Sequence, residues 1–392
     1  MDNKIQQKTA LALKFVLLFG AVSLFADLTY EGGASINGQF MATLGAGAAI
    51  VSVTSGLGEF LGYALRLLSG WIADKTGKYW AITFIGYIIN LFAVPAMFFA
   101  GYWWVAAVLI LAERIGRALR KPTVEAMLSY ATGALGKGWV YALNTALDET
   151  GAALGPLVIS IVLLFGGNYR IGYAVLLISA VMAISLLTLA RFTFPIPSRL
   201  EIKNIAMPEG FSKAFWLSTL AGLCFGTGFV SYELVPFHLA KTQAVAFQWI
   251  PLLLSFSTAC GVGVNLLLGK LFDRAALPTI FVAVVISSLF APLVFLGGMP
   301  GIFLGMIAWG VSYAIEDTLF SAIVAGYLPE GKRGFAFGLF FAVYGVGVLL
   351  GSIIMGFMYS YSISLMAGFS LTLQLLSLPL FFAVSRFQKR SA

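Results

Sequence analysis

The chain has 392 residues, of which 60% are hydrophobic and only 10% charged, and its formal net charge is +8. Soluble globular proteins carry about 25% charged residues, so this composition excludes an ordinary soluble domain and is typical of an integral membrane protein. The single histidine and two cysteines in apolar runs provide neither a disulfide framework nor the spacing of a metal site. We therefore expect no metal and no cofactor.

Apolar segments of about 20 residues, the length that crosses a bilayer, recur along the whole chain. The first follows a polar start, "MDNKIQQKTA", and no small-residue cleavage site follows it, so we expect this helix to be retained. An all-α membrane protein with twelve transmembrane helices is predicted. In chain order the spans are 11–31, 42–68, 81–100, 103–122, 139–165, 170–190, 213–235, 248–271, 279–297, 301–326, 335–358 and 364–385.

The basic residues indicate the orientation of these spans. If both termini are cytoplasmic, all but two of the 24 lysines and arginines, Arg170 and Lys241, lie at inward helix ends and inward loops. This is the pattern of a multi-pass protein of the plasma (inner) membrane with cytoplasmic termini. Because the positive charge is spread over short segments, it favours contact with the lipid bilayer and does not favour nucleic acid as a partner.

The chain divides into two similar halves. Residues 191–212 contain three prolines and no strong periodicity, and are predicted to form a cytoplasmic linker between six-helix bundles at 1–190 and 213–392. A shift of 196 residues aligns 135–156 with 331–352 and brings Gly151 and Gly155 into register with Gly347 and Gly351. Such parallel repeats indicate two pseudo-symmetric bundles around a central pathway.

A loop motif occurs between the second and third predicted spans, as "GWIADKTGKYW", and a weaker copy, "GKLFD", lies in the second half. With this motif, twelve spans and a half-chain repeat, the whole chain resembles the major facilitator superfamily. The resemblance implies two bundles that rock around a central site. The motif residues and their copy are Gly70, Asp74, Lys75, Gly77 and Lys78, and Gly269, Asp273 and Arg274.

The resemblance implies that this loop acts as a conformational latch. Asp74 can face a helix N-terminus or an arginine across the bundle. Arg114, Arg117 and Arg120 are expected near the same membrane face, in "ERIGRALRKP", which partly matches another family motif. The alternative interpretation is a solvated loop with ordinary charges.

The segment "GAALGP" at 151–156 resembles a glycine-rich motif of the proton-coupled antiporters in this family. Gly151 and Gly155 form a small-residue face that permits close helix packing in lipid, and Pro156 can bend the helix. Helix packing alone also explains the segment.

Acidic residues inside the spans are the candidates for substrate binding and proton coupling, because ionisable groups in a membrane are costly and face the interior or a cavity. Glu59, Asp148 and Glu316 lie about 14–16 Å from the inner ends of their spans, near the middle of an apolar core about 30 Å thick. The candidates are Asp27, Glu31, Glu59, Asp148, Glu149, Glu233, Glu316 and Asp317.

Neighbouring residues on a helix point about 100° apart, so Asp148 and Glu149 cannot face the same way. We expect Asp148 to contact a helix and Glu149 to face the cavity. A carboxyl group held away from water favours its protonated form and can exchange the proton for a cation. Alternatively, these acids are structural and pair with Arg66, Arg114 or Arg117.

The sequence therefore predicts a secondary active transporter that works by alternating access. Proton-coupled export of an organic or cationic compound is favoured, because the acids outnumber basic groups near the midplane. A proton-coupled uptake symporter, a divalent-cation carrier and a membrane scaffold or sensor on a transporter fold stay open. No nucleophile–base constellation and no GxxxxGK[ST] loop is present in the sequence, so we expect no enzyme. We expect a monomer.

Overall fold

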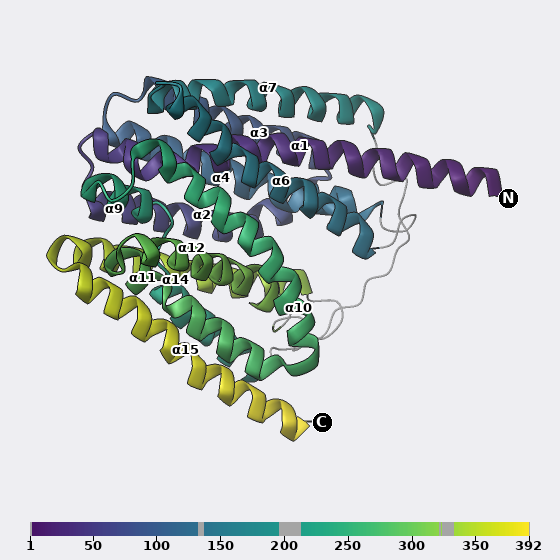
Figure 1. Cartoon of the computed structure of the whole chain (residues 1–392). Helices are drawn as coiled ribbons and strands as arrows, with labels where there is room; N and C mark the ends of the chain where they lie inside the picture. The colour runs from purple at the N-terminus through teal and green to yellow at the C-terminus, as the bar shows by residue number, and fades with distance from the viewer. Residues whose placement is uncertain (1, 132–136, 196–212, 321–322, 324–332, 392) are drawn as a thin grey trace. The chain divides into compact units, whose positions relative to one another are not determined.

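The computed structural model describes residues 2–131, 137–195, 213–320, 323 and 333–391. Every regular element in these ranges is a helix (Figure 1). This agrees with the sequence, since a lipid-embedded chain must satisfy its backbone hydrogen bonds within each segment. The first elements are α1 (Asp2–Thr43), α2 (Ala48–Thr76), α3 (Tyr79–Ala96), η1 (Met97–Phe99), α4 (Trp103–Ser129), α6 (Lys137–Leu164) and α7 (Tyr169–Thr193).

The later elements include several short segments between longer helices. They are α8 (Lys213–Gly228), α9 (Leu234–Thr242), η3 (Phe247–Trp249), α10 (Ile250–Ser288), α11 (Phe290–Leu296), α12 (Gly298–Ala314), η4 (Ile315–Phe320), α14 (Arg333–Tyr361) and α15 (Ile363–Ser391). The η4 segment has π-helical hydrogen bonding and continues α12 directly.

Nine segments of the described chain are long and apolar enough to cross a membrane. The predicted spans at 103–122, 213–235 and 301–326 differ for local reasons. The first carries a cluster of charged residues within α4, the second is interrupted after Gly228, and the third changes to a π-helix after Ala314. The number of twelve spans stays a prediction.

Helix lengths also differ from the predicted spans. The α1 helix extends beyond the predicted 11–31 at both ends, and α10 joins two predicted spans through a kink at Ala275, whose φ is −152° and ψ is 74°. Short turns separate other helices. Between α2 and α3, Gly77 has a φ of +66°, a conformation that glycine adopts without steric cost.

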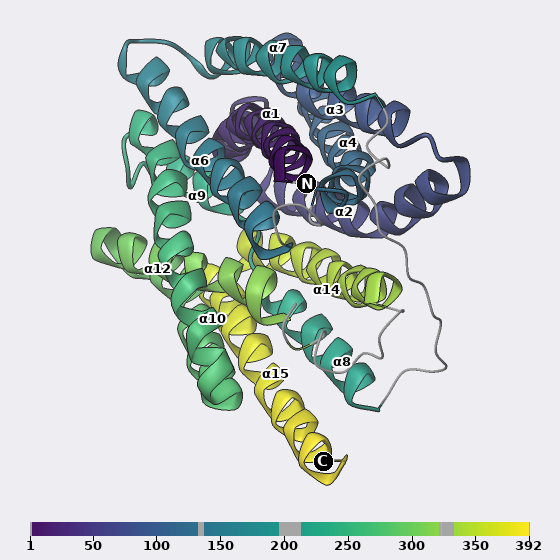
Figure 2. The same ribbon diagram turned by 90° about the vertical axis from the view of Figure 1, so that its right-hand side faces the viewer.

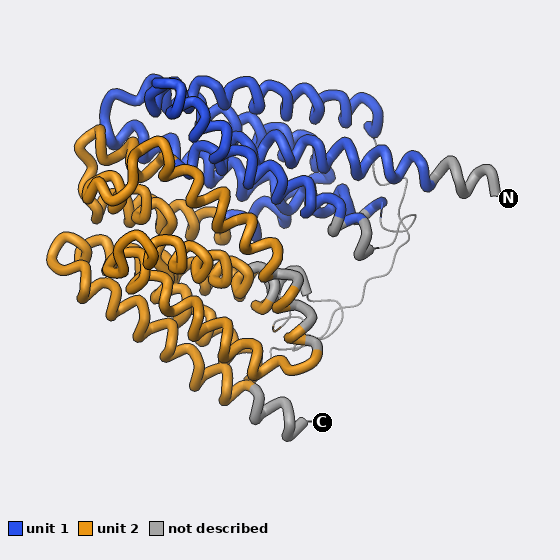
Figure 3. The backbone as a smooth tube through the Cα atoms, viewed as in Figure 1, with its two compact units in different colours: residues 1–35, 65–204 blue, residues 36–64, 205–392 orange. Residues whose placement is uncertain are grey.

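The chain forms two compact units (Figure 3). Unit 1 comprises residues 1–35 and 65–204, and unit 2 comprises 36–64 and 205–392. Two of the three boundaries between the units lie within α1 and α2, and the third, at 204/205, lies outside the described residues. The predicted bundles at 1–190 and 213–392 stay a prediction, and most of the predicted linker lies outside the described residues.

In unit 1, α1 is the central helix. Viewed nearly along its axis in Figure 2, it is surrounded by α3, α4, α6 and α7. Aromatic side chains fill part of this interior. Phe15 lies 4.8 Å from Phe19 and Phe19 lies 5.7 Å from Trp80, measured between ring centroids. The interior of unit 2 has an equivalent aromatic cluster, in which Phe320 lies 5.4 Å from Phe225 and 5.3 Å from Phe340.

Glycine pairs bring two helices into backbone contact in each unit. In unit 1, a Cβ atom added to Gly151 would clash with the carbonyl oxygen of Leu24, and one added to Gly155 would lie 2.7 Å from the backbone nitrogen of Gly32. In unit 2, Gly347 approaches the backbone of α8 in the same way. The predicted equivalence of Gly151 and Gly347 thus corresponds to the same kind of packing in both units.

We predict that Gly151→Ala lowers stability by about 1–3 kcal/mol, because the added methyl group collides with backbone that cannot rotate away. The measurement is the thermal unfolding midpoint in detergent. The matched control is Gly62→Ala, also within a helix, because a Cβ atom there meets nothing within 4 Å. An unfolding midpoint for Gly151→Ala that equals that of the control would contradict the packing interpretation.

Candidate functional site

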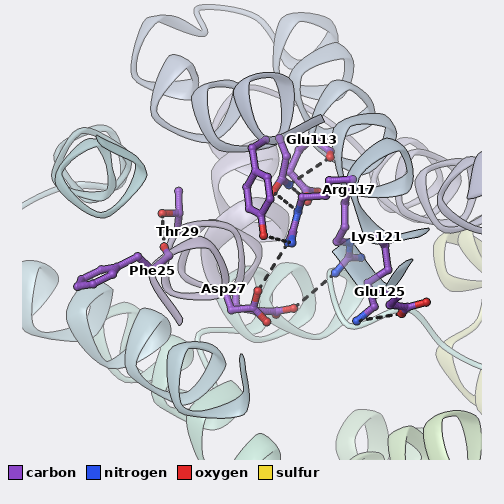
Figure 4. Close-up of polar contacts among 11 residues, drawn as sticks. Phe25, Asp27, Thr29, Glu113, Arg117, Lys121 and Glu125 are labelled. Atoms are coloured by element: carbon purple, nitrogen blue, oxygen red, sulfur yellow. Dashed lines mark hydrogen bonds and ion pairs between the residues drawn. The ribbon is translucent and has the colours of Figure 1, made fainter. Parts of the chain in front are cut away.

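The α4 helix carries three arginines, Arg114, Arg117 and Arg120, at intervals of three residues. This spacing places them along one side of the helix. They lie about 16–26 Å from the first residue of α4, Trp103, at a rise of about 1.5 Å per residue. Figure 4 shows that part of this side of α4 faces the acids of α1.

Arg120 is the most buried of the three, with 3% of its surface exposed. Its Nη2 lies 3.7 Å from Oδ1 of Asp27 on α1, whose exposure is 4%. The guanidinium also donates hydrogen bonds from Nε to Oδ1 of Asn90 at 3.2 Å and from Nη1 to the hydroxyl of Tyr87 at 3.2 Å. The rings of Tyr87 and Tyr30 lie 4.5 and 5.6 Å from Cζ, so neutral groups stabilise the charge as well.

The other two arginines have acidic partners of their own. Nη1 of Arg117 lies 3.7 Å from Oε1 of Glu31, and Nε of Arg114 lies 3.4 Å from Oε2 of Glu113. Asn90 connects the Glu113 and Arg120 pairs, because its side-chain amide donates to Oε1 of Glu113 at 2.8 Å while its oxygen accepts from Arg120. Arg117 adjoins them through the ring of Tyr30, which lies 4.9 Å from Cζ of Arg117 and 5.6 Å from Cζ of Arg120. We call these groups on α1, α3 and α4 the arginine network.

A fourth carboxylate adjoins the arginine network. Asp148 on α6 is close enough for its charge to act on both Asp27 and Arg120. No basic nitrogen lies within 4 Å of the Asp148 carboxylate in the described part of the chain. The neighbouring Glu149 is half-buried. Asp148 thus lies near the network on α6, while the expectation that Glu149 faces the cavity stays a prediction.

Two predicted acids of unit 2 have neutral hydrogen-bond partners. Glu233, 5% exposed and immediately before α9, accepts a hydrogen bond from the hydroxyl of Ser55 at 2.6 Å. Glu316 lies in the π-helical segment and accepts from the hydroxyl of Tyr344 at 3.1 Å. The charge of Glu59, on α2, acts on the same tyrosine. The side chain of Asp317 lies outside the described residues.

The latch motif is described only in part. The Nζ atom of Lys75 lies 4.7 Å from the ring centroid of Trp71, and Gly70 faces Pro122 of α4. Lys78 directly precedes α3, and Arg274 is exposed. The side chains of Asp74 and Asp273 lie outside the described residues, so the latch stays a prediction.

Sequence reasoning missed the neutral members of these clusters. Asn90 and Tyr87 lie three residues apart in α3, a helix that is otherwise apolar apart from a few hydroxyl side chains. An asparagine inside such a span must find a hydrogen-bond partner, so its presence was the available signal. Within the described residues, no group of three or more metal-ligating side chains is present.

We predict that Asp27→Asn lowers stability by about 3–5 kcal/mol, because it removes the ion-pair partner of a buried guanidinium. The double variant Asp27→Asn with Arg120→Gln should recover part of this loss, since neither charge then lies buried alone. The measurement is the thermal unfolding midpoint in detergent.

Lys121→Gln is the control for this prediction. It breaks the half-exposed ion pair with Glu125, at 4.0 Å, which is worth about 0–1 kcal/mol. If Asp27→Asn changed the unfolding midpoint no more than Lys121→Gln does, the buried pair of Asp27 and Arg120 would not contribute to stability.

Comparison with known proteins identifies the family. A model described as Major Facilitator Superfamily matches residues 17–352. An uncharacterised protein of Mycobacterium tuberculosis is 32% identical over 381 residues, covering 95% of this chain and 93% of that protein. An uncharacterised MFS-type transporter of Methanocaldococcus jannaschii is 26% identical and covers 89% of each chain. A mutant of the nucleoside transporter NupG shares the fold, with a TM-score of 0.76 at 15% identity over 94% of this chain and 100% of that one. The chain belongs to the Major Facilitator Superfamily.

Proposed function

We propose that this transporter exports a small organic or cationic compound in exchange for protons, and that Asp148 is the carboxylate that exchanges the proton. The superfamily fold implies secondary transport by alternating access. In the proposed arrangement the protein lies in the plasma membrane with cytoplasmic termini, and the bundles at 1–190 and 213–392 rock against each other.

The charge balance of the arginine network carries this proposal. The network has three guanidinium groups, each within 4 Å of a carboxylate, and Asp148 adds a fourth carboxylate. An uncompensated charge among membrane-spanning helices costs several kcal/mol. Asp148 can avoid this cost in two ways, by binding a proton or by binding a cationic solute.

Proton binding and cation binding at Asp148 exclude each other, and this mutual exclusion couples the movement of the proton to that of the cation. A carboxyl group that holds the proton is neutral and does not attract a cation, whereas a carboxylate that binds the cation has released its proton. If the protonated state favours access from one side of the membrane and the cation-bound state favours access from the other, one proton crosses the membrane for each cation that moves the other way. Asp148 also lies close enough to Asp27 and Arg120 for its charge to act on both, so its ionisation can change the contacts between α1, α4 and α6.

We predict that Asp148→Asn abolishes solute-driven proton movement, because an amide cannot release a proton. The experiment uses proteoliposomes with an internal pH dye, to which each solute is added from outside. The panel holds the organic cations berberine and tetraphenylphosphonium, and uridine, because NupG is a nucleoside transporter.

The control is Glu125→Gln, an acid-to-amide change at a half-exposed position near the end of α4, in the same unit as Asp148. We expect wild-type proton flux in this control and at least about a tenfold loss in Asp148→Asn, the effect of removing more than about 1.4 kcal/mol of coupling. Equal fluxes in both variants would rule out Asp148 as the coupling group. Proton flux in the same direction as the solute would indicate uptake symport instead.

A further inference from the structure

The first helical segment of the second half is broken in the interior of unit 2. The α8 helix ends at Gly228 and α9 begins at Leu234. The carbonyl oxygen of Gly228, which helix continuation would have engaged, accepts hydrogen bonds from Ser370 at 2.6 Å and from the side-chain amide of Gln374 at 3.1 Å. Helices broken near the middle of a membrane are the places where transporters bind their solutes. The break is therefore a built feature with its own polar support.

An aromatic wall lies beside this break. The ring of Tyr232, within the break, lies 5.5 Å from the ring of Trp309 on α12. Trp309 in turn stacks on Tyr313, with ring centroids 5.8 Å apart and an interplanar angle of 18°. Trp309 is 9% exposed, so the wall is largely shielded from solvent.

Trp309 has an unsatisfied hydrogen-bond donor. Its indole Nε1 is buried and finds no acceptor among the described residues, and the hydroxyl of Ser231 in the break has no partner there either. An indole N–H can only donate, and buried polar groups are nearly always satisfied in native proteins. An acceptor that belongs to a bound molecule would satisfy this donor.

A carboxylate lies farther along the same side of the helix. Trp309, Tyr313 and Glu316 follow each other at intervals of four and three residues, the spacing of one helix face. Glu316 lies about 10 Å along the axis from Trp309. It is set in a π-helical segment, a form that often marks functional sites.

Further rings surround Glu316. Tyr344 donates its hydroxyl hydrogen bond to this carboxylate, and the rings of Tyr63 and Phe341 stack nearby at 5.6 Å. Tyr344 contacts Tyr63 edge to face at 5.8 Å. A carboxylate bordered by aromatic rings attracts organic cations through both charge and cation–π contacts. An organic anion would be repelled by the carboxylate of Glu316.

We propose that the surface formed by Tyr232, Trp309, Tyr313 and Glu316 binds a flat organic cation that also carries a hydrogen-bond acceptor. The cationic end lies at Glu316, the ring system lies along Tyr313 and Trp309, and the acceptor oxygen or nitrogen takes the Trp309 N–H. This inference rests on the proposed transport function and names its substrate class and binding residues. It leaves proton exchange to Asp148 in unit 1.

The test measures equilibrium binding to the purified full-length protein in detergent, without any gradient. The probes are berberine, a flat cation with ether oxygens, tetraphenylphosphonium, a cation without acceptors, and 2-naphthoate, a flat anion. The variants are Glu316→Gln, Trp309→Phe, which keeps a ring but removes the N–H donor, and Trp309→Leu. The control is the exposed Trp71→Phe. Size-exclusion profiles and unfolding midpoints identify variants that fail to fold.

For the wild type we expect berberine to bind and 2-naphthoate not to bind. Glu316→Gln should raise the Kd of both cations about tenfold, the effect of about 1.4 kcal/mol. Trp309→Phe should raise the Kd of berberine about fivefold or more and leave that of tetraphenylphosphonium nearly unchanged, because only berberine uses the N–H donor. Trp309→Leu should weaken both cations.

Two results would overturn this inference. One is berberine binding that is equal in the wild type, Glu316→Gln and Trp309→Phe. The other is equal binding of 2-naphthoate and the cations, which would indicate a non-specific apolar surface. Failure here is distinguishable from failure of proton exchange. Cation binding that is lost in Glu316→Gln without any proton flux supports this site alone, whereas proton flux driven by uridine without berberine binding supports Asp148 alone.

Discussion

One buried positive charge, that of Arg120, organises unit 1. A guanidinium is always protonated, so Arg120 cannot lose its charge as a lysine or carboxyl group could. Its environment must therefore be built around it, and α1 and α3 both contribute. Asp27 supplies the opposite charge, and Asn90 and Tyr87 accept hydrogen bonds from Arg120. The aromatic ring of Tyr87 covers part of the guanidinium face. Helices α1, α3 and α4 are held in one relative register because these contacts are directional.

This arrangement also explains why the nearby acids are not equivalent. Glu31 and Glu113 lie within ion-pair distance of Arg117 and Arg114. Asp148 enters from another helix, next to a network whose guanidinium groups already have partners. In the proposed mechanism Asp148 exchanges the proton, whereas the paired acids hold the helices together. Residues of the same type thus have different roles according to their neighbours.

The sequence could predict the all-helical membrane fold because long apolar runs and the distribution of basic residues are global signals. It could also predict the corresponding glycines, since Gly151 and Gly347 must occupy equivalent close approaches. It could not predict which acid meets which arginine, because Asp27 and Arg120 are distant along the chain. Interruptions such as the one after Gly228 were missed for a similar reason, since their stability depends on Ser370 and Gln374 of a later helix. Hydropathy carries no information on such partners.

The glycine contacts also determine where unit 2 can bend. At Gly347 and Gly351, α14 meets α8 through backbone atoms, with no side chain between them that could change rotamer. Such a contact is stiff, because any tilt drives main-chain atoms into each other. Regular helical hydrogen bonding is interrupted between α8 and α9, and the backbone is non-helical at Ala275 within α10. Interruptions of this kind tolerate a change of helix direction better than the glycine contacts do, so the close approach of α14 to α8 keeps these two helices together as one body.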